Sequence, residues 1–572
     1  MSWIFGALGN GTASEAELYS SIHPQPIFCV QRDSFYVAAG GLTETCKSNV
    51  TSPHQETGWI VCGKGITHNN GSPSFMETSD WESIISRRVF PVENLDGHFT
   101  GIRWDTDGAL CFTDVLGLRD MYFTKWHNRI IFSTRLDWMT KIKNTCAINF
   151  EEFGARWLFT NQLSRESVLT QIQRLSGGSA TLTFGSLIIH NKPWEPDFTK
   201  RSTPEETIEA LQNMVSFVPQ TGHQFTLCLS GGMDSRAMLA LILQDSGTDF
   251  KTCTFGNPEH PDARIAKHIC NSISIGNESL IEPIPSVEKC VAMIRELNAN
   301  TLVTNPASLI LQLRYFPSLY AHNRVIIDGG FGGLWRRELL NRLFIVGRQS
   351  VLTANFIGIK KYISMNRGNI FTRDVADIMD AGALQQIENA YMSMPKINNI
   401  GIENWLDLFS VRTHLPNFEC PEQSRMDNFI VSYMPFSQPS LINKMLALPP
   451  KLRKNAFLFR KIIKNKAQSI SQFPLVTHDT IYPFGLSSLA LRIWTKTKRK
   501  AGFGYNSTTP NELLTWLREF IQDTVNSSGV KQCEYYDYPK IVEMTTRFYN
   551  GETRLANHMD WWLAFEIWRQ SI

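Results

Sequence analysis

The sequence predicts two domains: an α+β N-terminal domain built on a two-layer antiparallel sheet, and an α/β domain that ends in a helical C-terminal region. Short apolar runs separated by Asp-Gly, His-Asn and other glycine-containing turns fill the first third, a pattern typical of antiparallel strands. From about residue 200, unalternating apolar strands are separated by helices, which is typical of a parallel sheet covered on both faces. A chain of 572 residues is also longer than one ordinary domain.

The N-terminal domain is predicted to start with short strands, among them the apolar runs at 59–62, 109–112 and 129–132. Several of these runs end near glycine, and together they are expected to form two packed sheets. The sequence INFEEFGARWLFTN then predicts a helix, and SATLTFGSLIIHN predicts a final strand pair that closes the domain.

The segment 197–204 is predicted to be a linker, so that the domains cover 1–196 and 205–572. The sequence around it, KPWEPDFTKRSTPEE, is rich in proline and polar residues. The last two hundred residues read mostly as helix and end in HMDWWLAFEIWRQ, whose aromatic side chains are expected to pack in a core.

The second domain is expected to begin with a capped helix. Thr203 can serve as its N-cap, Pro204 suits the first helical position, and Glu206 can complete a capping box. The strand FTLCLS and a helix from Arg236 follow, then the strand FKTCTFG, a helix from about Ala263 and the strand NRVIIDGG. This alternation is the basis for predicting parallel sheet.

The composition gives no reason to expect nucleic acid or a membrane as a partner. The formal net charge of +3 is small for this size, and the densest basic run, Lys496, Lys498, Arg499 and Lys500, is expected to be solvated surface. Eleven cysteines include no Cys-x-x-Cys pair, so neither a zinc site nor a disulfide framework is predicted. With no leader pattern and no apolar run of membrane-spanning length, a cytoplasmic location is predicted.

The string Ser-Gly-Gly-Met-Asp-Ser at 230–235 is the strongest functional signal, because it joins an apolar strand directly to an apolar helix. A helix N-terminus attracts anions, and glycine allows the backbone to approach phosphate oxygens closely. Ser230 and Ser235 add hydroxyl donors, and Asp234 beside an anion makes sense when Mg²⁺ joins them. We therefore expect the loop to bind the pyrophosphate of ATP. The alternative is an ordinary strand-to-helix turn in which Ser or Asp acts as the cap. No lysine follows the glycines, so the loop is not a Walker sequence.

Together with its surroundings, this loop resembles the asparagine synthetase family, which includes β-lactam synthetase and the lasso peptide cyclases. MSWIFG resembles the family's opening, and NLDGHFTGIRWD followed by DVLGLRDMYFTKWHNRIIFSTRLDWMTK keeps the order of its glutamine-hydrolysing domain. TFGNPEHPDARIAKHI resembles the second nucleotide segment, and RVIIDGGFGG stands where the third belongs. The resemblance covers nearly the whole chain.

This resemblance implies a glutamine amidotransferase-like, Ntn-hydrolase-like N-terminal domain and a PP-loop synthetase domain of the adenine nucleotide α-hydrolase kind. The cofactors that it implies are ATP and Mg²⁺, with Asp234 and Asp328 as metal ligands. Asp234, Asp328 and Lys461 are the predicted catalytic residues, Phe255 is expected to lie against the adenine through its backbone, and Asp262 is the acid of the second segment. The predicted ATP-binding residues are Leu229, Ser230, Gly231, Gly232, Asp234, Ser235, Phe255, Asp262, Asp328, Gly329 and Gly330.

The chain departs from the family at the glutaminase. The family places cysteine directly after the initiator methionine, whereas this chain has Ser2 followed by Trp3. An N-terminal serine can act as such a nucleophile, but CGKGITHNNG replaces the family's glutamine-holding segment. We therefore expect the N-terminal domain to be a structural remnant.

It also departs at the third nucleotide segment, because no acid stands between Gly329 and Leu334. The family's second magnesium carboxylate falls on Gly333, which leaves Asp328 as the nearby acid to replace it; alternatively, Asp234 holds the metal together with the phosphates and water. Arg336 and Arg337 follow at once and can neutralise pyrophosphate, or they lie on a solvated helix face.

A third departure concerns the lysine that many members use to stabilise the pentavalent phosphorus. RKNAFLFRKIIKNKAQSISQF matches the helix before that lysine, but the next segment, PLVTHDTIYPFGLSS, has His478 and Asp479 and no lysine. Lys461, Lys464 and Lys466 are the candidates to replace it, and Lys461 is our choice.

The predicted function is ATP-dependent amide formation: a carboxylate is adenylated, pyrophosphate leaves, and an amine displaces AMP. Without a glutaminase the amine belongs to the substrate, which favours a lasso peptide cyclase that makes a macrolactam and works with a precursor-peptide protease. The alternatives are an amide ligase for a small acid or sugar acid, with free ammonia as a possible amine, and a catalytically weak scaffold homologue.

Overall fold

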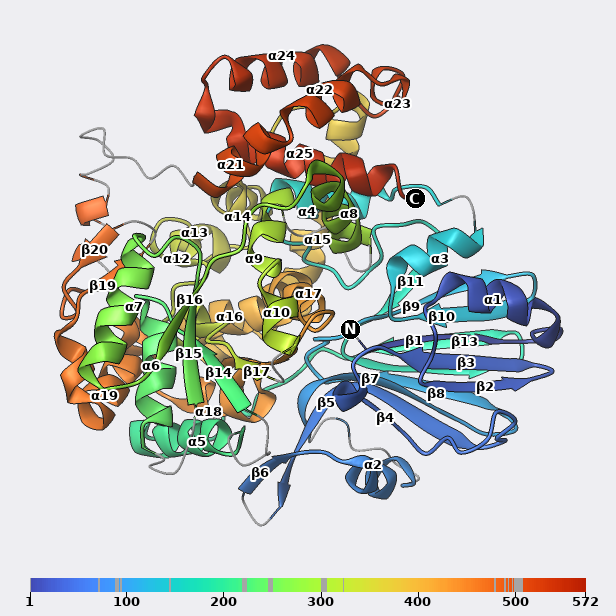
Figure 1. Ribbon diagram of the computed structural model, residues 1–572, viewed down its shortest axis with the longest axis horizontal. Helices are drawn as coiled ribbons and strands as arrows, with labels where there is room; N and C mark the ends of the chain where they lie inside the picture. The colour runs from blue at the N-terminus through green and yellow to red at the C-terminus, as the bar shows by residue number, and fades with distance from the viewer. Residues whose placement is uncertain are drawn as a thin grey trace.

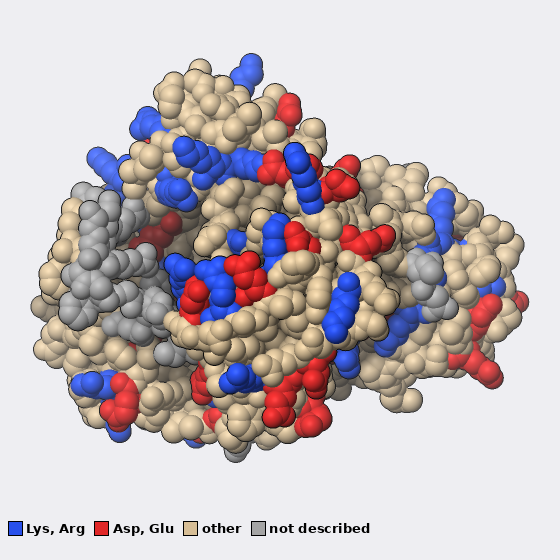
Figure 2. All heavy atoms as spheres, turned by 90° about the horizontal axis from the view of Figure 1, so that it is seen from above, with Lys and Arg blue, Asp and Glu red and all other residues tan. Residues whose placement is uncertain are grey.

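The structure is a computed structural model, and the residues that it describes are 2–69, 72–87, 92, 95–143, 146–218, 224–244, 250–299, 306–321, 324–477, 480–487, 490–491, 493–495, 497 and 508–572. Figure 1 shows antiparallel sheets on one side of the molecule, a parallel sheet on the other, and the last helices across the top. The chain starts in the middle, where the two halves meet (Figure 1). On the face seen from above, acidic and basic side chains lie close together around a hollow (Figure 2).

Two antiparallel sheets form the N-terminal half, as predicted. The first has the order β11 (Gln173–Leu175), β9 (Met121–Trp126), β10 (Arg129–Ser133), β1 (Trp3–Leu8), β3 (Phe35–Gly40) and β2 (Phe28–Arg32). The second has the order β13 (Ser186–Asn191), β12 (Gly178–Thr183), β8 (Gly108–Thr113), β7 (Asp96–Trp104), β5 (Gly58–Asn69) and β4 (Cys46–Ser48), with β6 (Ser72–Phe75) also paired to β5. The strand pair expected in SATLTFGSLIIHN is β12 and β13.

These sheets pack face to face, because alternate residues of each strand point in opposite directions. Ile4 and Leu8 of β1 share a buried core with Ile60 and Cys62 of β5. The outer faces are covered by helices: α1 (Ala16–Ile22) and α3 (Leu136–Lys143) on the first sheet, and α2 (Thr78–Ile85) on the second. The result is a helix–sheet–sheet–helix layering.

A parallel sheet forms the centre of the second half, with the order β16 (Asn277–Leu280), β15 (Phe250–Phe255), β14 (Gln224–Cys228), β17 (Arg324–Ile327) and β18 (Val431–Tyr433). Numbered along the chain within this sheet, the order is 3-2-1-4-5, so the winding direction reverses between β14 and β17. Ligands of open α/β sheets bind beyond the carboxyl ends of the strands at such a reversal.

Helices cover both faces of the parallel sheet. Phe225 and Leu227 of β14 share a core with α5 (Pro204–Ser216), α6 (Met233–Ile242), α7 (Pro261–Ser272), α18 (Pro439–Ala447) and α19 (Phe457–Lys466). Cys253 and Ile326 face α8 (Val287–Ala299), α9 (Ile310–Leu313) and α10 (Phe316–Ala321) instead. The predicted start of α5 is confirmed, since the side chains of Thr203 and Glu206 form a capping box and Pro204 is the first helical residue.

The rest of the chain is mainly helical. The elements are α11 (Gly332–Trp335), α12 (Asn341–Ile345), α13 (Arg348–Leu352), α14 (Phe356–Ile363), α15 (Arg373–Met392), α16 (Ile397–His414), α17 (Cys420–Met426), α21 (Thr508–Trp516), α22 (Arg518–Asn526), α23 (Ser528–Lys531), α24 (Tyr538–Tyr549) and α25 (Ala556–Arg569), with a small hairpin of β19 (Leu475–Thr477) and β20 (Thr480–Tyr482). In the part of the chain described, no helix combines the length and the apolar character needed to cross a bilayer.

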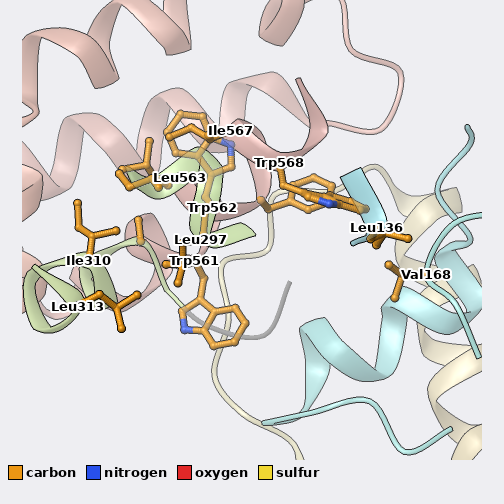
Figure 3. Close-up of a cluster of buried hydrophobic side chains, with 14 of the residues drawn as sticks. Leu136, Val168, Leu297, Ile310, Leu313, Trp561, Trp562, Leu563, Ile567 and Trp568 are labelled. Atoms are coloured by element: carbon orange, nitrogen blue, oxygen red, sulfur yellow. The ribbon is translucent and has the colours of Figure 1, made fainter. Parts of the chain in front are cut away.

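The aromatic stripe of α25 packs in the core, as predicted. Trp562 and Phe565 are fully buried, and Figure 3 shows Trp568 beside Leu136 and Val168 of the N-terminal half. The ring of Trp568 also stacks on Phe153, at 6.3 Å between centroids.

The two halves share further helix packing. The helix predicted in INFEEFGARWLFTN is α4 (Phe150–Leu158), and it lies against α15 with glycine on both sides of the contact. A Cβ on Gly154 would lie 2.2 Å from the carbonyl oxygen of Met379, and a Cβ on Gly382 would lie 2.2 Å from that of Glu151. Because α4 belongs to the N-terminal sequence and packs on C-terminal helices, the boundary at 197–204 stays a prediction.

Candidate active site

The loop at 230–235 lies where the strand order reverses. It follows β14, and the loop that starts at Asp328 follows the neighbouring parallel strand β17. A Cβ on Gly329 would lie 3.2 Å from both the carbonyl carbon of Asp234 and the amide nitrogen of Ser235. The two predicted nucleotide segments therefore meet at the carboxyl edge of the sheet, in contact with each other.

The backbone amides at the start of this loop are bonded within the protein. The amide of Ser230 donates to Oγ of Ser235 at 3.1 Å, and that of Gly232 donates to Oγ of Ser230 at 3.1 Å. The amide of Gly231 donates to Oδ1 of Asp262 at 2.9 Å. Asp262, the predicted acid of the second segment, thus contacts the loop through this bond.

The first turn of α6 is where the loop can hold an anion. The helix begins at Met233, three residues before the predicted start at Arg236, and Gly232 as N-cap offers no side-chain cap. The first N–H groups of a helix have no acceptor within the helix. The amides of residues 230–232 are already bonded, so those of the first turn of α6 are the ones left to bind an anion.

Residues 473–476, which include the start of β19, pack against the loop. The amide of Val476 in β19 donates to the carbonyl of Gly231 at 2.9 Å, and the guanidinium of Arg236 donates to the carbonyls of Phe473 and Pro474 at 2.7 and 2.8 Å. This segment stands where the resembling family has its lysine. His478 and Asp479 lie outside the described residues.

Lys461, the predicted catalytic lysine, does not contact the loop through any bond found in the described residues. Its ammonium group pairs with Glu205 in the first turn of α5, and both side chains are partly exposed. Its catalytic role stays a prediction, because a change of partner is needed before it can reach a phosphate.

Asp234 is held by Arg336. Oδ1 of Asp234 lies 2.6 Å from Nε of Arg336, and Oδ2 accepts from Nη2 at 3.0 Å. A Cβ on Gly332 would lie 2.3 Å from the carboxyl carbon of Asp234, so this carboxylate occupies the space that a side chain at 332 would need. Burial raises the pKa of Asp234, and the charge of Arg336 offsets only part of that rise.

Arg337 has a different environment from Arg336. Its Nε donates to Oδ1 of Asp407 at 3.0 Å, Arg453 contacts the same carboxylate, and the Arg337 side chain is 4% exposed. Arg337 is thus part of a buried structural ion cluster, and of the two arginines only Arg336 belongs to the site.

Asp328 lies at the end of β17 with its carboxylate turned back on its own loop. Its Oδ1 accepts the amide of Gly330 at 2.7 Å. Burial raises the pKa of Asp328 to about 6, and the negative charges of Glu419 and Asp234 add to the rise. Burial also raises the pKa of Glu422 to about 8, with Glu419 and Asp328 adding to it. The electrostatic potential around these carboxylates is therefore negative, which opposes a bound phosphate unless a cation is present.

As they lie, these residues do not fit a magnesium ion held by the protein. The Asp234 carboxylate is already paired with Arg336, and the part of the chain described contains no group of three or more His, Cys, Asp or Glu side chains placed to hold a metal. The assignment of Mg²⁺ to Asp234 and Asp328 stays a prediction that requires Asp234 to leave Arg336.

The predicted adenine segment forms the end of β15. The ring of Phe255 stacks on Tyr315, with 5.2 Å between centroids, and meets Phe316 edge-on. Leu229 is buried, and its amide donates to the carbonyl of Cys253 at 2.8 Å. The ring of Phe255 is thus in contact with other aromatic rings, and the contact of its backbone with adenine stays a prediction.

Ser2, at the family's nucleophile position, lies in a closed polar network. It is fully buried, and its Oγ accepts from Thr45 at 3.0 Å and from Nη1 of Arg119 at 3.4 Å. A cavity of about 10 Å³, lined in part by Arg119, adjoins this network. Such a volume holds about one water molecule, which is far too little for a glutamine side chain.

The Ser2 network continues into the other half of the molecule. Nη2 of Arg119 donates to Oδ2 of Asp427 at 2.7 Å, and Nδ1 of His98 lies 3.1 Å from the same oxygen. Although burial alone would raise it, the bond from His98 and the charge of Arg119 hold the pKa of Asp427 well below its usual range. None of these residues, nor Glu419 and Glu422, was predicted. Arg119 and Asp427 are 308 positions apart, and no local pattern marks such a pair.

Comparison with known proteins yields no family assignment. No protein-family model matches the chain, and no curated protein matches its sequence. Among solved structures it is similar to glutamine phosphoribosylpyrophosphate amidotransferase from B. subtilis in complex with ADP and GMP, at 10% identity over 57% of this chain and 81% of that chain, with a TM-score of 0.23. It is also similar to NMN synthetase from Francisella tularensis, at 15% identity over 39% and 91% of the two chains (TM-score 0.20), and to an allosteric regulatory enzyme of purine biosynthesis, at 10% identity over 61% and 78% (TM-score 0.21). At such scores the fold description rests on the strand orders and registers given above.

Proposed function

We propose that this chain is an ATP-dependent amide-forming enzyme that adenylates a substrate carboxylate. The observation that carries the proposal is the position of the Ser230–Ser235 loop, which opens the uncapped helix α6 at the reversal point of a parallel sheet. Uncapped helix N-termini at such points bind phosphate groups through backbone amides and the helix dipole.

The proposed reaction has two steps. A carboxylate oxygen attacks the α-phosphorus of ATP, the bond to the bridging oxygen breaks, and pyrophosphate leaves. An amine nitrogen then attacks the acyl carbon, AMP leaves with its oxygen, and the nitrogen loses a proton. The chain's part is to hold the departing pyrophosphate at the start of α6, next to Asp234 and Arg336.

The finer structural assignments belong to the same proposal. We assign 1–196 to a degenerate, Ntn-hydrolase-like amidotransferase domain, 197–204 to a linker and 205–572 to a PP-loop synthetase domain. The helix–sheet–sheet–helix layering supports the first assignment, and the 3-2-1-4-5 strand order supports the last. The predicted cytoplasmic location stays a prediction.

The amine is proposed to belong to the substrate. This is supported by the Ser2 network, because Ser2 is fully buried and the cavity of about 10 Å³ beside its partner Arg119 is too small for a glutamine side chain. The leading version is a macrolactam cyclase of the lasso peptide type, which joins the N-terminal amine of a peptide to an Asp or Glu side chain, with a precursor-peptide protease as partner. Tethering the amine to the activated carboxylate makes the attack effectively unimolecular. An amide ligase acting on a small acid with free ammonia is the alternative within the enzymes.

A scaffold homologue is the second candidate, and one observation favours it. The amide of Gly231 is taken by Asp262, and the carboxylate of Asp234 is taken by Arg336. An enzyme that binds ATP needs the first turn of α6 to stay uncapped, whereas a scaffold that no longer binds ATP does not. ATP binding at this turn therefore decides between the enzyme and the scaffold.

Calorimetric titration of ATP tests the proposal without knowledge of the acid. The wild type should bind ATP, and Gly232→Ala should bind at least tenfold more weakly, because its methyl group would stand 3.0 Å from Oγ of Ser230 at the mouth of the loop. Gly276→Ala is the matched control, since its added carbon meets no atom within 4 Å. A wild type that does not bind ATP, or equal affinities in all three proteins, would overturn the proposal. AMP and pyrophosphate release with peptides that carry a free amine and an Asp or Glu then separates cyclase from small-acid ligase.

A further inference from the structure

We propose that Arg336 is the fixed cation of the nucleotide site: it anchors Asp234 and binds phosphate oxygens directly, where the family resemblance placed a magnesium ion held by carboxylates. The inference rests on the proposed function, since it concerns how the same site binds ATP. It assigns a role to a residue for which the sequence left two alternatives open, pyrophosphate binding or a solvated helix face.

The first support is the geometry of the Arg336–Asp234 pair. The guanidinium contacts both carboxylate oxygens: Nη2 donates a hydrogen bond to Oδ2 at 3.0 Å, and Nε lies 2.6 Å from Oδ1 as an ion-pair contact that is not aligned as a hydrogen bond. The side chains are 20% and 23% exposed. A solvated helix face is therefore the wrong description: the pair is largely enclosed, with one edge open.

A second support is Gly332, which lies one helical turn before Arg336. The amide of Arg336 donates to the carbonyl of Gly332 at 3.1 Å, and the Asp234 carboxylate fills the space beside Gly332. No side chain fits at 332 while Asp234 is paired with Arg336. The loss of acids from DGGFGG and the presence of Arg336 are thus two parts of one arrangement.

The third support is the balance of charge. Asp234, Asp328 and Glu338 surround the loops, and Glu338 is joined to Nη1 of Arg336. Asp234 and Glu338 already offset the single positive charge of Arg336, so Arg336 contributes directed N–H donors to the ligand more than net positive charge. Arginine has five N–H donors and stays protonated at any ordinary pH. Nη1 donates one hydrogen bond to Glu338 and Nη2 donates one to Asp234, so each of these nitrogens keeps one N–H for phosphate oxygens.

Arg337 cannot play this part, because it is enclosed with Asp407 and Arg453. The described residues form no cluster of three metal-ligating side chains, so a Mg²⁺ ion at this site would have to arrive with the phosphates of ATP. Two arginines contact the Ser230–Ser235 loop: Arg236 is fully buried and donates to the carbonyls of Gly231, Phe473 and Pro474, whereas Arg336 pairs with the Asp234 carboxylate and stays 20% exposed.

The test is calorimetric titration of ATP and of inorganic pyrophosphate, with excess EDTA and with Mg²⁺, on wild type, Arg336→Met and Arg336→Lys. The wild type should bind ATP in EDTA within about threefold of its affinity in Mg²⁺. Arg336→Met should weaken binding at least thirtyfold under both conditions, and Arg336→Lys should recover only part of it, because lysine lacks the fork. Arg342→Met is the control, since Arg342 is exposed on α12 and packs over Tyr362, and it should bind like the wild type.

Gly332→Ala is the second variant, in case Arg336→Met does not fold. Its methyl group displaces Asp234 from the pair, so binding in EDTA should fall at least tenfold, while Gly333→Ala, whose nearest neighbour is Leu339 at 3.5 Å, should not change. Binding by the wild type that requires Mg²⁺, together with unchanged binding by Arg336→Met or Gly332→Ala, would overturn the inference and leave the proposed function standing. A wild type that binds ATP under neither condition would instead remove the proposed function itself.

Discussion

Ser2 and the Ser230–Ser235 loop occupy the two positions at which the resembling family does chemistry, yet their surroundings differ. The oxygens of Ser2 are buried and accept bonds from Thr45 and Arg119, and Arg119 continues to Asp427 in the other half of the chain. The loop ends in an uncapped helix, and Asp234 and Arg336 beside it keep part of their surface exposed.

This difference is the one expected between a structural site and a binding site. Polar groups that find all their partners inside the protein stabilise one arrangement, and removing one partner leaves the others buried and unpaired. Polar groups that remain open at the reversal point of a parallel sheet can bind a ligand. The Ser2 network therefore joins the two halves, and the Ser230–Ser235 loop is the proposed reaction site.

The largest effect on the free energy of unfolding is expected from breaking the contact between Arg119 and Asp427, which joins the two halves. Asp427→Ala removes the partner of Arg119 and His98, and also the acceptor of Oγ of Ser432 at 2.7 Å. Loss of one member of a buried ion pair costs about 3–5 kcal/mol, which urea unfolding should show. Asp537→Ala, which breaks a partly exposed pair with Lys540, should cost less than about 1 kcal/mol. Equal costs would mean that the Ser2 network is not a structural tie.

The pH dependence of the free energy of unfolding should report on Asp114, which accepts the backbone amide of Arg119 in the same region. Asp114 accepts the amides of Leu118 and Arg119, and burial raises its pKa to about 7. Because this value exceeds the roughly 3.9 of an unfolded aspartate, the native state holds the extra proton between these pH values. The free energy of unfolding should therefore fall as pH rises from about 4 to 7, by up to about 1.4 kcal/mol per pH unit from this group. Asp114→Asn should remove that part of the slope, and an unchanged slope would contradict the assignment.

A smaller effect is expected at the loop itself. Asp262→Asn keeps an oxygen that can accept the Gly231 amide and removes one negative charge beside the proposed phosphate position. Pyrophosphate should bind about three- to tenfold more tightly, or about 0.7–1.4 kcal/mol, in calorimetric titration at low salt. Weaker binding would show that the Asp262 charge assists the ligand, for example by holding a cation.

The smallest effect is expected from Ser2→Ala. The variant removes one acceptor of Thr45 and Arg119, but Nη1 of Arg119 keeps the carbonyl oxygen of Ser2 at 3.2 Å, so about 0.5 kcal/mol of stability should be lost. Glutamine with hydroxylamine should give no hydroxamate with either protein. Hydroxamate from the wild type that is lost in Ser2→Ala would instead make Ser2 a working nucleophile.

Local patterns were enough to predict much of the fold. Alternation and turn residues indicated the paired antiparallel sheets, the capping box at Thr203 is confirmed, and the aromatic stripe of α25 is buried. The start of α6 was wrong by three residues, because the helix begins at Met233 inside the functional string. Met233, Asp234 and Ser235 were interpreted as part of a phosphate-binding loop, although they form the first turn of the helix.

The candidate site could be predicted only in part. The string at 230–235 gave the loop, but the partners of Asp234 and Gly231 come from Arg336 and Asp262, and only the folded chain shows which contact forms. The same holds for Arg119 and Asp427, which are joined across the two halves. Pairs of this kind depend on tertiary packing, and a single sequence carries no periodicity or spacing that reveals them.

Hydrogen–deuterium exchange with and without ATP measures both regions in one experiment. If the backbone at the start of α6 binds the phosphates, a peptide covering residues 229–238 should exchange more slowly when ATP is present, while a peptide covering residues 2–8 should not change. No protection at 229–238 at saturating ATP, or protection confined to the segment around Ser2, would contradict the assignment of the nucleotide site to this loop.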